Sequence, residues 1–234
     1  MSFPKKMIID AVIPARGGSK RIPGKNIKSF AGKPLIAWSI ELAIACTRIR
    51  NVYVSTDSQE IAEVAKEAGA TVITRPDEIS GHLSTDFEFF QHLLETVAEA
   101  PEALVHLRPT YPTRSKEILE LALDRFIAHE PSALRTVIPC EHPPYKCYTL
   151  DGETLAPLVP ALAGVDRPYD CPTQLLPKTY RHNGYIDIVA RNTVLNGSVS
   201  GNKMHAYVMS PDDVHDIDTH EEWALAEAAH YGSL

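Results

Sequence analysis

The segment from Ala11 to Asn26, AVIPARGGSKRIPGKN, places glycines and cations directly after an apolar run. Backbone amides that are freed by Gly17, Gly18 and Gly24 can converge on an anion. The cations that accompany these glycines are Arg16, Lys20, Arg21 and Lys25. This combination predicts a binding site for a polyphosphate.

Two common nucleotide-binding motifs do not fit the segment. The GxxxxGK[ST] motif does not match, because Gly18 and Gly24 lie one residue too far apart. In addition, Asn26 stands where this motif has the Ser or Thr that binds the metal. The GxGxxG motif is absent, so an oxidoreductase that binds a dinucleotide loses its main support. Taken alone, the loop is also consistent with a solvated turn, because glycine is common in loops.

A second group of residues has the spacing of a metal site. In HDIDTHEE, Asp216 and Asp218 are two residues apart at an expected strand end, so both carboxylates can reach one hard cation. A structural alternative exists, because Asp218 and Glu221 have the capping-box spacing for the last helix. The two roles are compatible. The neighbouring histidines, His215 and His220, also make zinc a candidate metal.

Strands and helices alternate along the chain that must position these residues. Short apolar runs predict strands at 7–14, 51–56, 71–74, 103–107, 185–190 and 204–209. Helical spacing predicts helices at 35–46, 57–69, 87–98, 116–128 and 218–230, with Asp57 as the cap of the second. This order predicts an α/β fold with a doubly wound, mostly parallel sheet that binds ligands outside the carboxyl ends of its strands.

The segment at about 141–178 differs from the rest, because it is rich in proline and weak in periodicity. We interpret it as an arm that is inserted into a single domain spanning residues 1–234. The fixed backbone angles of proline lower the entropy that such an arm loses when it docks.

Composition narrows the class of protein further. A formal charge of -7 argues against general nucleic-acid binding, which normally needs a basic face. No run approaches the length of a membrane span, and the first ten residues are too polar for a signal peptide. The four cysteines form no CxxC pair, so we expect cytosolic thiols and a cytoplasmic protein.

Linked motifs in the chain resemble the acylneuraminate (CMP-sialic acid synthetase-like) cytidylyltransferases. These motifs are IPARGGSKRIPGKNIKSFAGKPLIAWSI, VSTDSQEIAEVAKEAGA, RPDEIS, LRPTYPTR, HPPYK, YRHNGYIDI and DIDTHEEWALAE. The resemblance runs nearly end to end and implies a Rossmann-like nucleotidyltransferase fold. It also implies that a hydroxyl of a sugar acid attacks the α-phosphorus of CTP and that pyrophosphate leaves, a reaction that depends on positioning and charge neutralisation.

The resemblance assigns roles on the nucleotide side. Arg16 and Lys25 are implied to grip the triphosphate, and Gly17, Gly18 and Ser19 to complete the cradle. The residues implied to contact the cytosine and ribose are Asn26, Arg75 and Ser84. Asp216 and Asp218 are implied to bind Mg²⁺, and triphosphate chemistry favours Mg²⁺ over zinc. We count Asp216, Arg16 and Lys25 as the catalytic residues. The alternative for Arg75 is a surface turn residue before Pro76.

On the acceptor side the expected contacts are Lys146, Tyr180, Arg181 and Asn183, although Lys146 is also consistent with an exposed arm residue. Three positions depart from the family pattern. Arg108 replaces a frequent glutamine, Thr173 a common arginine, and Asp187 a frequent tyrosine, so Arg108 and Asp187 join the predicted acceptor site. The acidic acceptor therefore stays open among sialic, legionaminic, pseudaminic and other acids, including a non-sugar carboxylate or phosphonate.

Two further alternatives stay open. A CMP-KDO synthetase is the nearest other activity, although YRHNGYIDI and DIDT are more similar to the acylneuraminate branch. A regulator that binds nucleotide without turnover is a different class, which loss of the aspartate pair would favour. The resemblance finally implies a homodimer in which the arm of one subunit reaches the acceptor site of the other.

Overall fold

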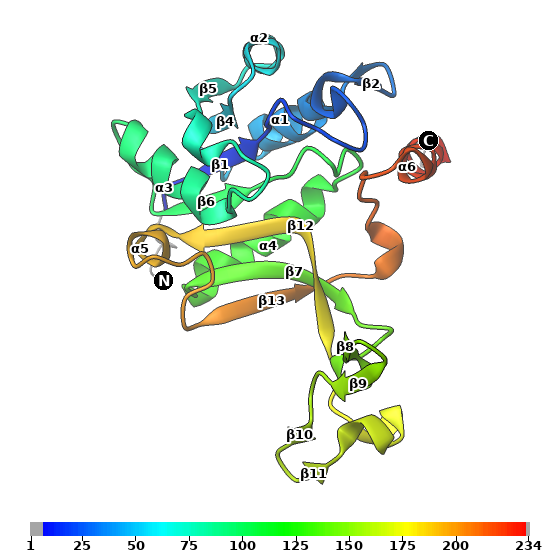
Figure 1. The fold of residues 1–234 in the computed structure, drawn as a ribbon. Coiled ribbons are helices and arrows are strands. Elements are labelled where there is room, and N and C mark those ends of the chain that lie inside the picture. The colour runs from blue at the N-terminus through cyan, green and yellow to red at the C-terminus, as the bar shows by residue number, and fades with distance from the viewer. Residues whose placement is uncertain (1–6, 233–234) are drawn as a thin grey trace.

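The computed structural model describes residues 7–232, which form one large sheet, flanking helices and a projecting arm (Figure 1). Residues 1–6, which belong to the segment predicted not to be a signal peptide, lie outside this range, as do 233–234. The strands of the large sheet are β1 (Ile9–Pro14), β4 (Val52–Thr56), β5 (Thr71–Thr74), β6 (Ala103–His106), β7 (Ala133–Pro139), β12 (Tyr180–Ala190) and β13 (Met204–Val208).

The sheet has the strand order β13-β7-β12-β6-β1-β4-β5. All its pairings are parallel except those of β12, which runs antiparallel to both β6 and β7. The predicted mostly parallel sheet is therefore confirmed. Strand β7 is an addition to the predicted elements.

Helices cover both faces of the sheet. They are α1 (Leu35–Ala45), α2 (Gln59–Glu67), α3 (Asp86–Thr96), α4 (Lys116–His129) and α5 (Arg191–Leu195), whereas α6 (His220–Gly232) packs in a separate cluster beside the sheet. Because side chains alternate along a strand, Ala11 and Ile13 of β1 enter the core under α1, α2 and α4. Val12 enters a second core, which α3 and α5 cover. Helix α5 was not predicted.

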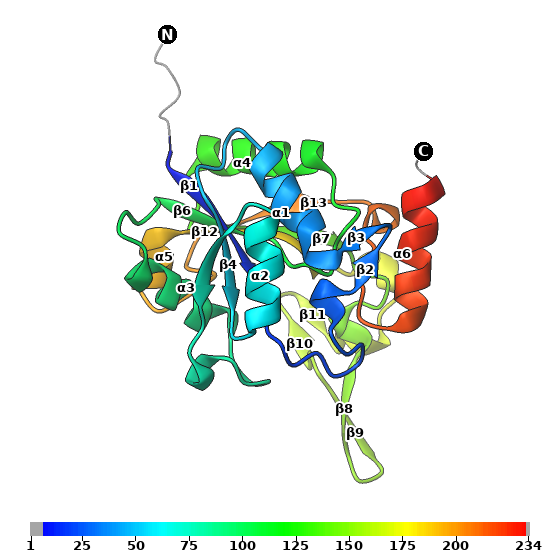
Figure 2. The same ribbon diagram turned by 90° about the horizontal axis from the view of Figure 1, so that it is seen from above.

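A third apolar cluster joins the two segments that the sequence predicts to do chemistry. Ile22 from the glycine-containing loop and Ile217 from the aspartate segment are both buried in it, together with Trp223 of α6. Burial of a side chain of this size contributes about 1.5–3 kcal/mol, so the cluster holds the two segments together. Figure 2 shows α6 beside the small hairpin of β2 (Ser29–Phe30) and β3 (Lys33–Pro34), which also belongs to this cluster.

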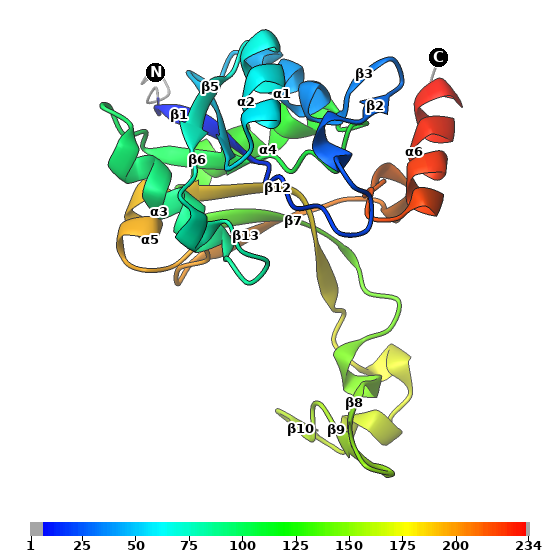
Figure 3. The same cartoon turned by 45° about the horizontal axis from the view of Figure 1, so that its top comes forward.

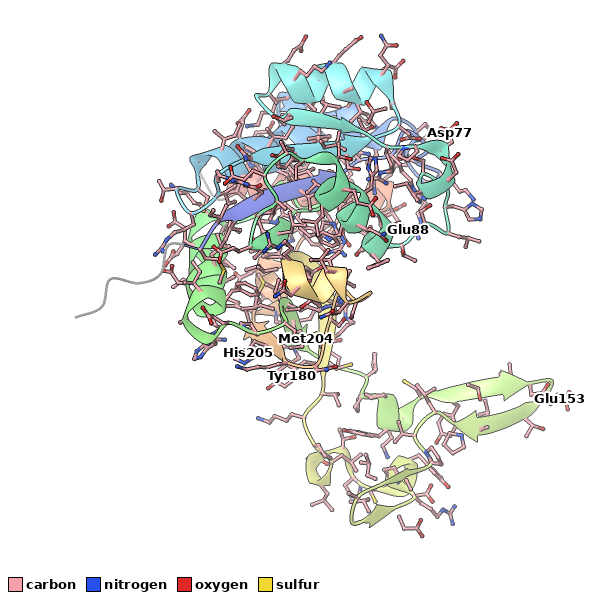
Figure 4. The ribbon with its side chains drawn as sticks, turned by 90° about the vertical axis from the view of Figure 1, so that its left-hand side faces the viewer. Asp77, Glu88, Glu153, Tyr180, Met204 and His205 are labelled. Carbon is pink, nitrogen blue, oxygen red and sulfur yellow. The ribbon has the colours of Figure 1, made fainter. Side chains whose placement is uncertain are left out.

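The arm leaves the sheet between β7 and β12 and projects from the body (Figure 3). Its strands are β8 (Tyr148–Asp151), β9 (Thr154–Pro157), β10 (Ala161–Leu162) and β11 (Val165–Asp166), which form two antiparallel hairpins. Figure 4 shows Glu153 at the tip of the longer hairpin and Tyr180 where the chain returns to the body. Within residues 7–232 no helix is both long and apolar enough to cross a membrane.

Candidate active site

A cavity of about 580 Å³ opens beyond the carboxyl ends of β1 and β6. Nine of the predicted site residues line it. They are Arg16, Ser19, Lys25, Asn26, Arg75, Ser84, Arg108, Asp216 and Asp218. The other predicted residues do not line this cavity, and they are Gly17, Gly18, Lys146, Tyr180, Arg181, Asn183 and Asp187.

The glycine-containing loop is held in place by hydrogen bonds to its backbone. The amide of Gly17 donates to Oδ1 of Asp57 at 2.8 Å, and Nδ2 of Asn26 donates to the carbonyl of Arg16 at 3.2 Å. A side chain at Gly17 would place Cβ 3.2 Å from Cβ of Ser58, so the loop packs closely against the start of α2. The buried Asn26 therefore orders the loop, and its predicted contact with a nucleotide remains a prediction.

Asp57 does not cap α2, contrary to the sequence analysis. The helix begins one residue later than expected, and Oγ of Ser58 accepts from the amide of Ile61. The carboxylate of Asp57 is thereby free to accept from Gly17 across 40 residues of sequence. This contact was missed because a local capping pattern gives no sign of a partner in a distant loop.

Lys25 connects the loop to the aspartate pair. Its Nζ donates to the carbonyl of Ile217 at 2.8 Å and to Oδ1 of Asp218 at 2.9 Å, while Nη1 of Arg21 lies 2.7 Å from Oδ2 of Asp218. Burial acts to raise the pKa of Asp218, but the hydrogen bonds and charges of Lys25 and Arg21 outweigh it and lower that pKa. Asp218 is therefore a carboxylate that two cations share.

Asp216 lies in a different environment from Asp218. Its Oδ1 is buried and has no hydrogen-bond partner. Burial raises the pKa of Asp216, a hydrogen bond from Thr110 opposes the rise, and the nearby charge of Asp218 adds to it. An unpartnered buried oxygen is costly, so this carboxylate is suited to a bound cation.

The last helix is capped by neighbours of the aspartate pair and not by the pair itself. Oγ1 of Thr219 accepts from the amide of Glu222, and Oε2 of Glu222 accepts from the amides of Asp218 and Thr219. The capping box therefore lies one residue beyond the spacing of Asp218 and Glu221. The side chain of Asp218 remains directed to Lys25 and Arg21.

Arg75 is buried in the cavity wall, so its interpretation as a surface turn residue is wrong. Its Nε donates to Oγ of Ser55 at 3.0 Å and its Nη2 to the carbonyl of Ser55 at 2.8 Å. The guanidinium also lies 5.4 Å from the ring centre of Phe89. Burial lowers the pKa of Arg75, although the side chain stays charged. These contacts hold a cation at the place where the cytosine and ribose of the nucleotide are predicted to bind.

The two cations predicted to bind the triphosphate are both anchored to backbone carbonyls. Nη1 of Arg16 donates to the carbonyl of Gly81 at 2.9 Å, which connects the loop to the opposite lip of the cavity. That lip also carries Ser84. The arrangement places two backbone-anchored cations, Arg16 and Lys25, around one space.

Arg108 contributes the other end of the cavity. Its Nη2 donates to Oδ2 of Asp86 at 2.8 Å, and its Nη1 donates to Oδ2 of Asp187 at 2.8 Å and to the carbonyl of Gly184 at 2.9 Å. The hydrogen bond from His182 and the charge of Arg108 overcome the effect of burial and lower the pKa of Asp187. Asp187 therefore supports Arg108 from behind the cavity lining.

The remaining acceptor-side predictions fall outside the cavity. Oδ1 of Asn183 accepts from Thr136 and from the amide of Tyr185, so Asn183 stabilises the irregular part of β12. Nζ of Lys146 donates to two carbonyls within the arm, at 2.6 Å each, and Tyr180 and Arg181 are exposed at the start of β12. None of these four residues lines the cavity with Arg108.

Sequence reasoning missed His106, Asp86 and Thr110 in the cavity lining, whereas Lys20 and Arg21, which it grouped with the glycine-containing loop, do line the cavity. His106 had a detectable signal, because it lies near the end of the predicted strand 103–107, two residues before Arg108, at the edge where ligands were expected to bind. Asp86 had none, since its contact with Arg108 spans 22 residues.

The chain matches the family description "Cytidylyltransferase" over residues 11–125. Over 230 residues it is 34% identical to the CMP-N,N'-diacetyllegionaminic acid synthase of Legionella pneumophila, covering 94% of this chain and 95% of that protein. It is 32% identical over 224 residues to the N-acylneuraminate cytidylyltransferase of Oncorhynchus mykiss, covering 95% of this chain. The chain spans only half the length of that relative, at 50%.

A solved structure supports the fold assignment. The CMP:2-keto-3-deoxy-manno-octonic acid synthetase complexed with CTP superposes with a TM-score of 0.72, covering 97% of this chain and 100% of that chain. The two sequences are 17% identical, so this likeness concerns the fold. Together with the sheet order, it confirms the predicted Rossmann-like nucleotidyltransferase architecture.

Proposed function

The chain belongs to the acylneuraminate cytidylyltransferase family, and we propose that it joins CMP from CTP to an acidic acceptor of the nonulosonic (sialic-acid-like) class, releasing pyrophosphate. One observation carries the proposal. A single cavity collects two anchored cations, Arg16 and Lys25, and a carboxylate pair, Asp216 and Asp218, at the carboxyl edge of the sheet.

The cations suit the charge that moves during nucleotidyl transfer. The acceptor hydroxyl oxygen forms a bond to the α-phosphorus and loses its proton, while the bond from that phosphorus to the bridging oxygen breaks and its electrons leave with pyrophosphate. Arg16 offers a planar fork to phosphate oxygens and Lys25 a point charge. Carbonyl contacts already hold both side chains at the cavity, so the two cations are positioned before the leaving group forms.

Asp216 and Asp218 fit Mg²⁺, which we propose as the cofactor. Magnesium is usually held by one or two carboxylates and by substrate phosphates, and the unpartnered Oδ1 of Asp216 is a free ligand of this kind. The described residues contain no group of three or more His, Cys, Asp or Glu side chains that could hold a metal, which disfavours zinc. When bound, Mg²⁺ would neutralise charge on the triphosphate.

We further propose a cytoplasmic homodimer. Lys146, Tyr180 and Arg181 are remote from the cavity lining of their own subunit, and the arm exposes large apolar side chains such as Leu150 and Leu155. A second copy that covers these leucines would bring its arm residues toward the acceptor. The four cysteines are free thiols, as expected in the cytoplasm.

The test is an assay of pyrophosphate release with CTP, Mg²⁺ and a panel of nonulosonic acids, KDO and acidic non-sugar acceptors. We expect release that requires an acceptor, a product with the mass of the CMP conjugate, and loss of at least 100-fold in rate for Asp216→Ala. Asp212→Ala, which changes an exposed aspartate outside the cavity, is the matched control. Tight CTP binding with no turnover across the panel would instead support a regulator.

A further inference from the structure

Asp86, His106 and Arg108 line the acceptor end of the cavity, and Asp187 lies behind Arg108; we call these four side chains the acceptor wall. Strand pairing assembles it, because Asp187 of β12 lies opposite His106, the last residue of β6, and Arg108 comes two residues later. Asp86 enters from the first residue of α3. Of the two carboxylates, Asp187 is nearly buried, with 7% of its side chain exposed, and Asp86 is 45% exposed in the cavity lining.

The guanidinium of Arg108 is largely satisfied before any ligand arrives. A guanidinium has five N–H donors, and three of these in Arg108 are bound to Asp86, Asp187 and Gly184. Two carboxylates thus face one guanidinium. Arg108 therefore does not provide an uncompensated positive charge for the carboxylate of an acceptor.

His182 lies beside Asp187 and outside the cavity lining. Its Nε2 is 2.7 Å from Oδ1 of Asp187, and its Nδ1 is 3.4 Å from Nη1 of Arg135. Arg135 and the buried Arg114 are also absent from the cavity lining, so none of these three side chains presents a cation to a ligand in the cavity.

His106 provides an independent sign that the wall awaits a ligand. The ring is 1% exposed, lines the cavity, and has no hydrogen-bond partner on either nitrogen. Its Nδ1 lies 3.8 Å from carboxylate oxygens of both Asp86 and Asp187, too far for a hydrogen bond. Burial, together with the charge of Arg108, lowers its pKa, so the imidazole is neutral. Counted over its four side chains, the acceptor wall therefore carries one net negative charge. Arg75, a further cation that interacts with Asp86, is bound to Ser55.

We propose that the acceptor wall recognises a cationic nitrogen substituent of the acceptor, such as an amidine or a protonated amine, with Asp86 as its ion-pair partner. This inference rests on the proposed function and specifies its acceptor. An amidinium can place two N–H donors on a carboxylate, as arginine does. The carboxylate of the acceptor binds away from this wall, because like charges repel. The acceptor is then a zwitterion and not a simple acid.

The test compares two forms of the same nonulosonic acid that differ at one nitrogen, the acetamidino form and the nearly isosteric acetamido form. The measurement is the ratio of kcat/KM for the two acceptors, obtained from pyrophosphate release at saturating CTP. We expect the wild-type chain to prefer the cationic form by at least tenfold. In Asp86→Asn this preference should fall by at least tenfold, and Asp86→Glu should retain part of it.

Asp77→Asn is the matched control, because it removes the same charge at a residue outside the cavity lining. Thermal unfolding and calorimetric binding of CTP report whether each variant is folded. Equal use of the two acceptors by the wild-type chain, or an unchanged ratio in Asp86→Asn, would overturn the inference while the cytidylyltransferase activity stood. Failure of every acceptor with every variant would instead count against the proposed function.

Discussion

Nζ of Lys25 lies 2.9 Å from Oδ1 of Asp218, so a proposed phosphate ligand and a proposed metal ligand neutralise each other. Arg21 binds the second oxygen of the same carboxylate. A triphosphate with Mg²⁺ would exchange these partners, because the cations would turn to phosphate and the carboxylate to the metal. The carboxylate proposed to bind the metal is therefore paired with two cations before the reactants enter.

This pairing gives opposite expectations for binding and turnover in Asp218→Asn. Without Mg²⁺, CTP should bind about threefold to tenfold more tightly, because Lys25 and Arg21 are released and a negative charge is removed; a partly exposed pair is worth about 1 kcal/mol. With Mg²⁺ and acceptor, turnover should fall at least 100-fold. Calorimetry in EDTA and the pyrophosphate assay measure the two effects. Asp212→Asn serves as control, and weaker metal-free binding would contradict the pairing argument.

Arg75→Lys tests whether the buried guanidinium reads the nucleotide. Lysine cannot keep both contacts to Ser55 and the stacking on Phe89, so we expect KM for CTP to rise at least tenfold. The free energy of unfolding should fall by about 1–3 kcal/mol, because the buried hydrogen bonds of the guanidinium to Oγ and to the carbonyl of Ser55 are lost. Lys66→Arg, on the outer surface of α2, is a control for the exchange itself. An unchanged KM with reduced stability would assign Arg75 a structural role only.

Gly184→Ala should displace Arg108. Gly184 has φ +73°, and a Cβ there would lie 2.8 Å from Nη1 of Arg108. Gly164 has a similar φ of +77° with no atom within 4 Å of its Cβ, so Gly164→Ala isolates the backbone cost of about 1–2 kcal/mol. We expect Gly184→Ala to lose more stability than this control and to raise KM for the acceptor, with little change in CTP affinity. Equal losses in the two variants would show that Arg108 adapts without cost.

Asp187 should stabilise the fold in a pH-dependent way. Its pKa is lowered in the folded state, so its contribution is complete above the unfolded value near 3.8 and is lost as pH falls through the folded value. Removing a partner from such a buried ion pair costs about 3 kcal/mol. The difference in unfolding free energy between the wild-type chain and Asp187→Asn should therefore be constant from pH 8 to 5 and shrink below pH 4. Urea denaturation across this range measures it, and a difference that grows toward acid pH would reverse the assignment.

The sequence predicted the elements that have strong local signals. Strands β1 and β4 and helices α1 and α4 follow from apolar runs and helical spacing, because these patterns depend on neighbours in the chain. Strand β7 was missed because Arg135 and Thr136 interrupt its apolar run. In the fold Thr136 is nevertheless buried, and its hydroxyl forms hydrogen bonds with the backbone of Ile186 in β12. Helix α5 has only five residues and too few turns to give a periodic signal.

The sequence predicted the site residues that lie in the linked motifs. It did not predict the contacts that depend on the register between two strands. Nine predicted residues line one cavity, because the motifs end at the same edge of the sheet. The acceptor wall depends on β12 running antiparallel beside β6, which puts Asp187 opposite His106. No local pattern specifies that register, so the cation predicted at Arg108 gave no sign of the two carboxylates that bind it.

The arm offers a test of the proposed homodimer. Leu150 and Leu155 are paired across the β8–β9 hairpin and are 68% and 60% exposed in one subunit, so a partner that covers them would gain about 1.5–3 kcal/mol for each. We expect Leu150→Ser/Leu155→Ser to raise the dimer dissociation constant at least 100-fold in analytical ultracentrifugation. Leu225→Ser, at an equally exposed leucine of α6 (65%), should leave it unchanged. If the double variant dissociates and loses turnover of the acceptor but keeps its affinity for CTP, the arm completes the acceptor site of its partner. If the double variant stays dimeric, the interface lies elsewhere.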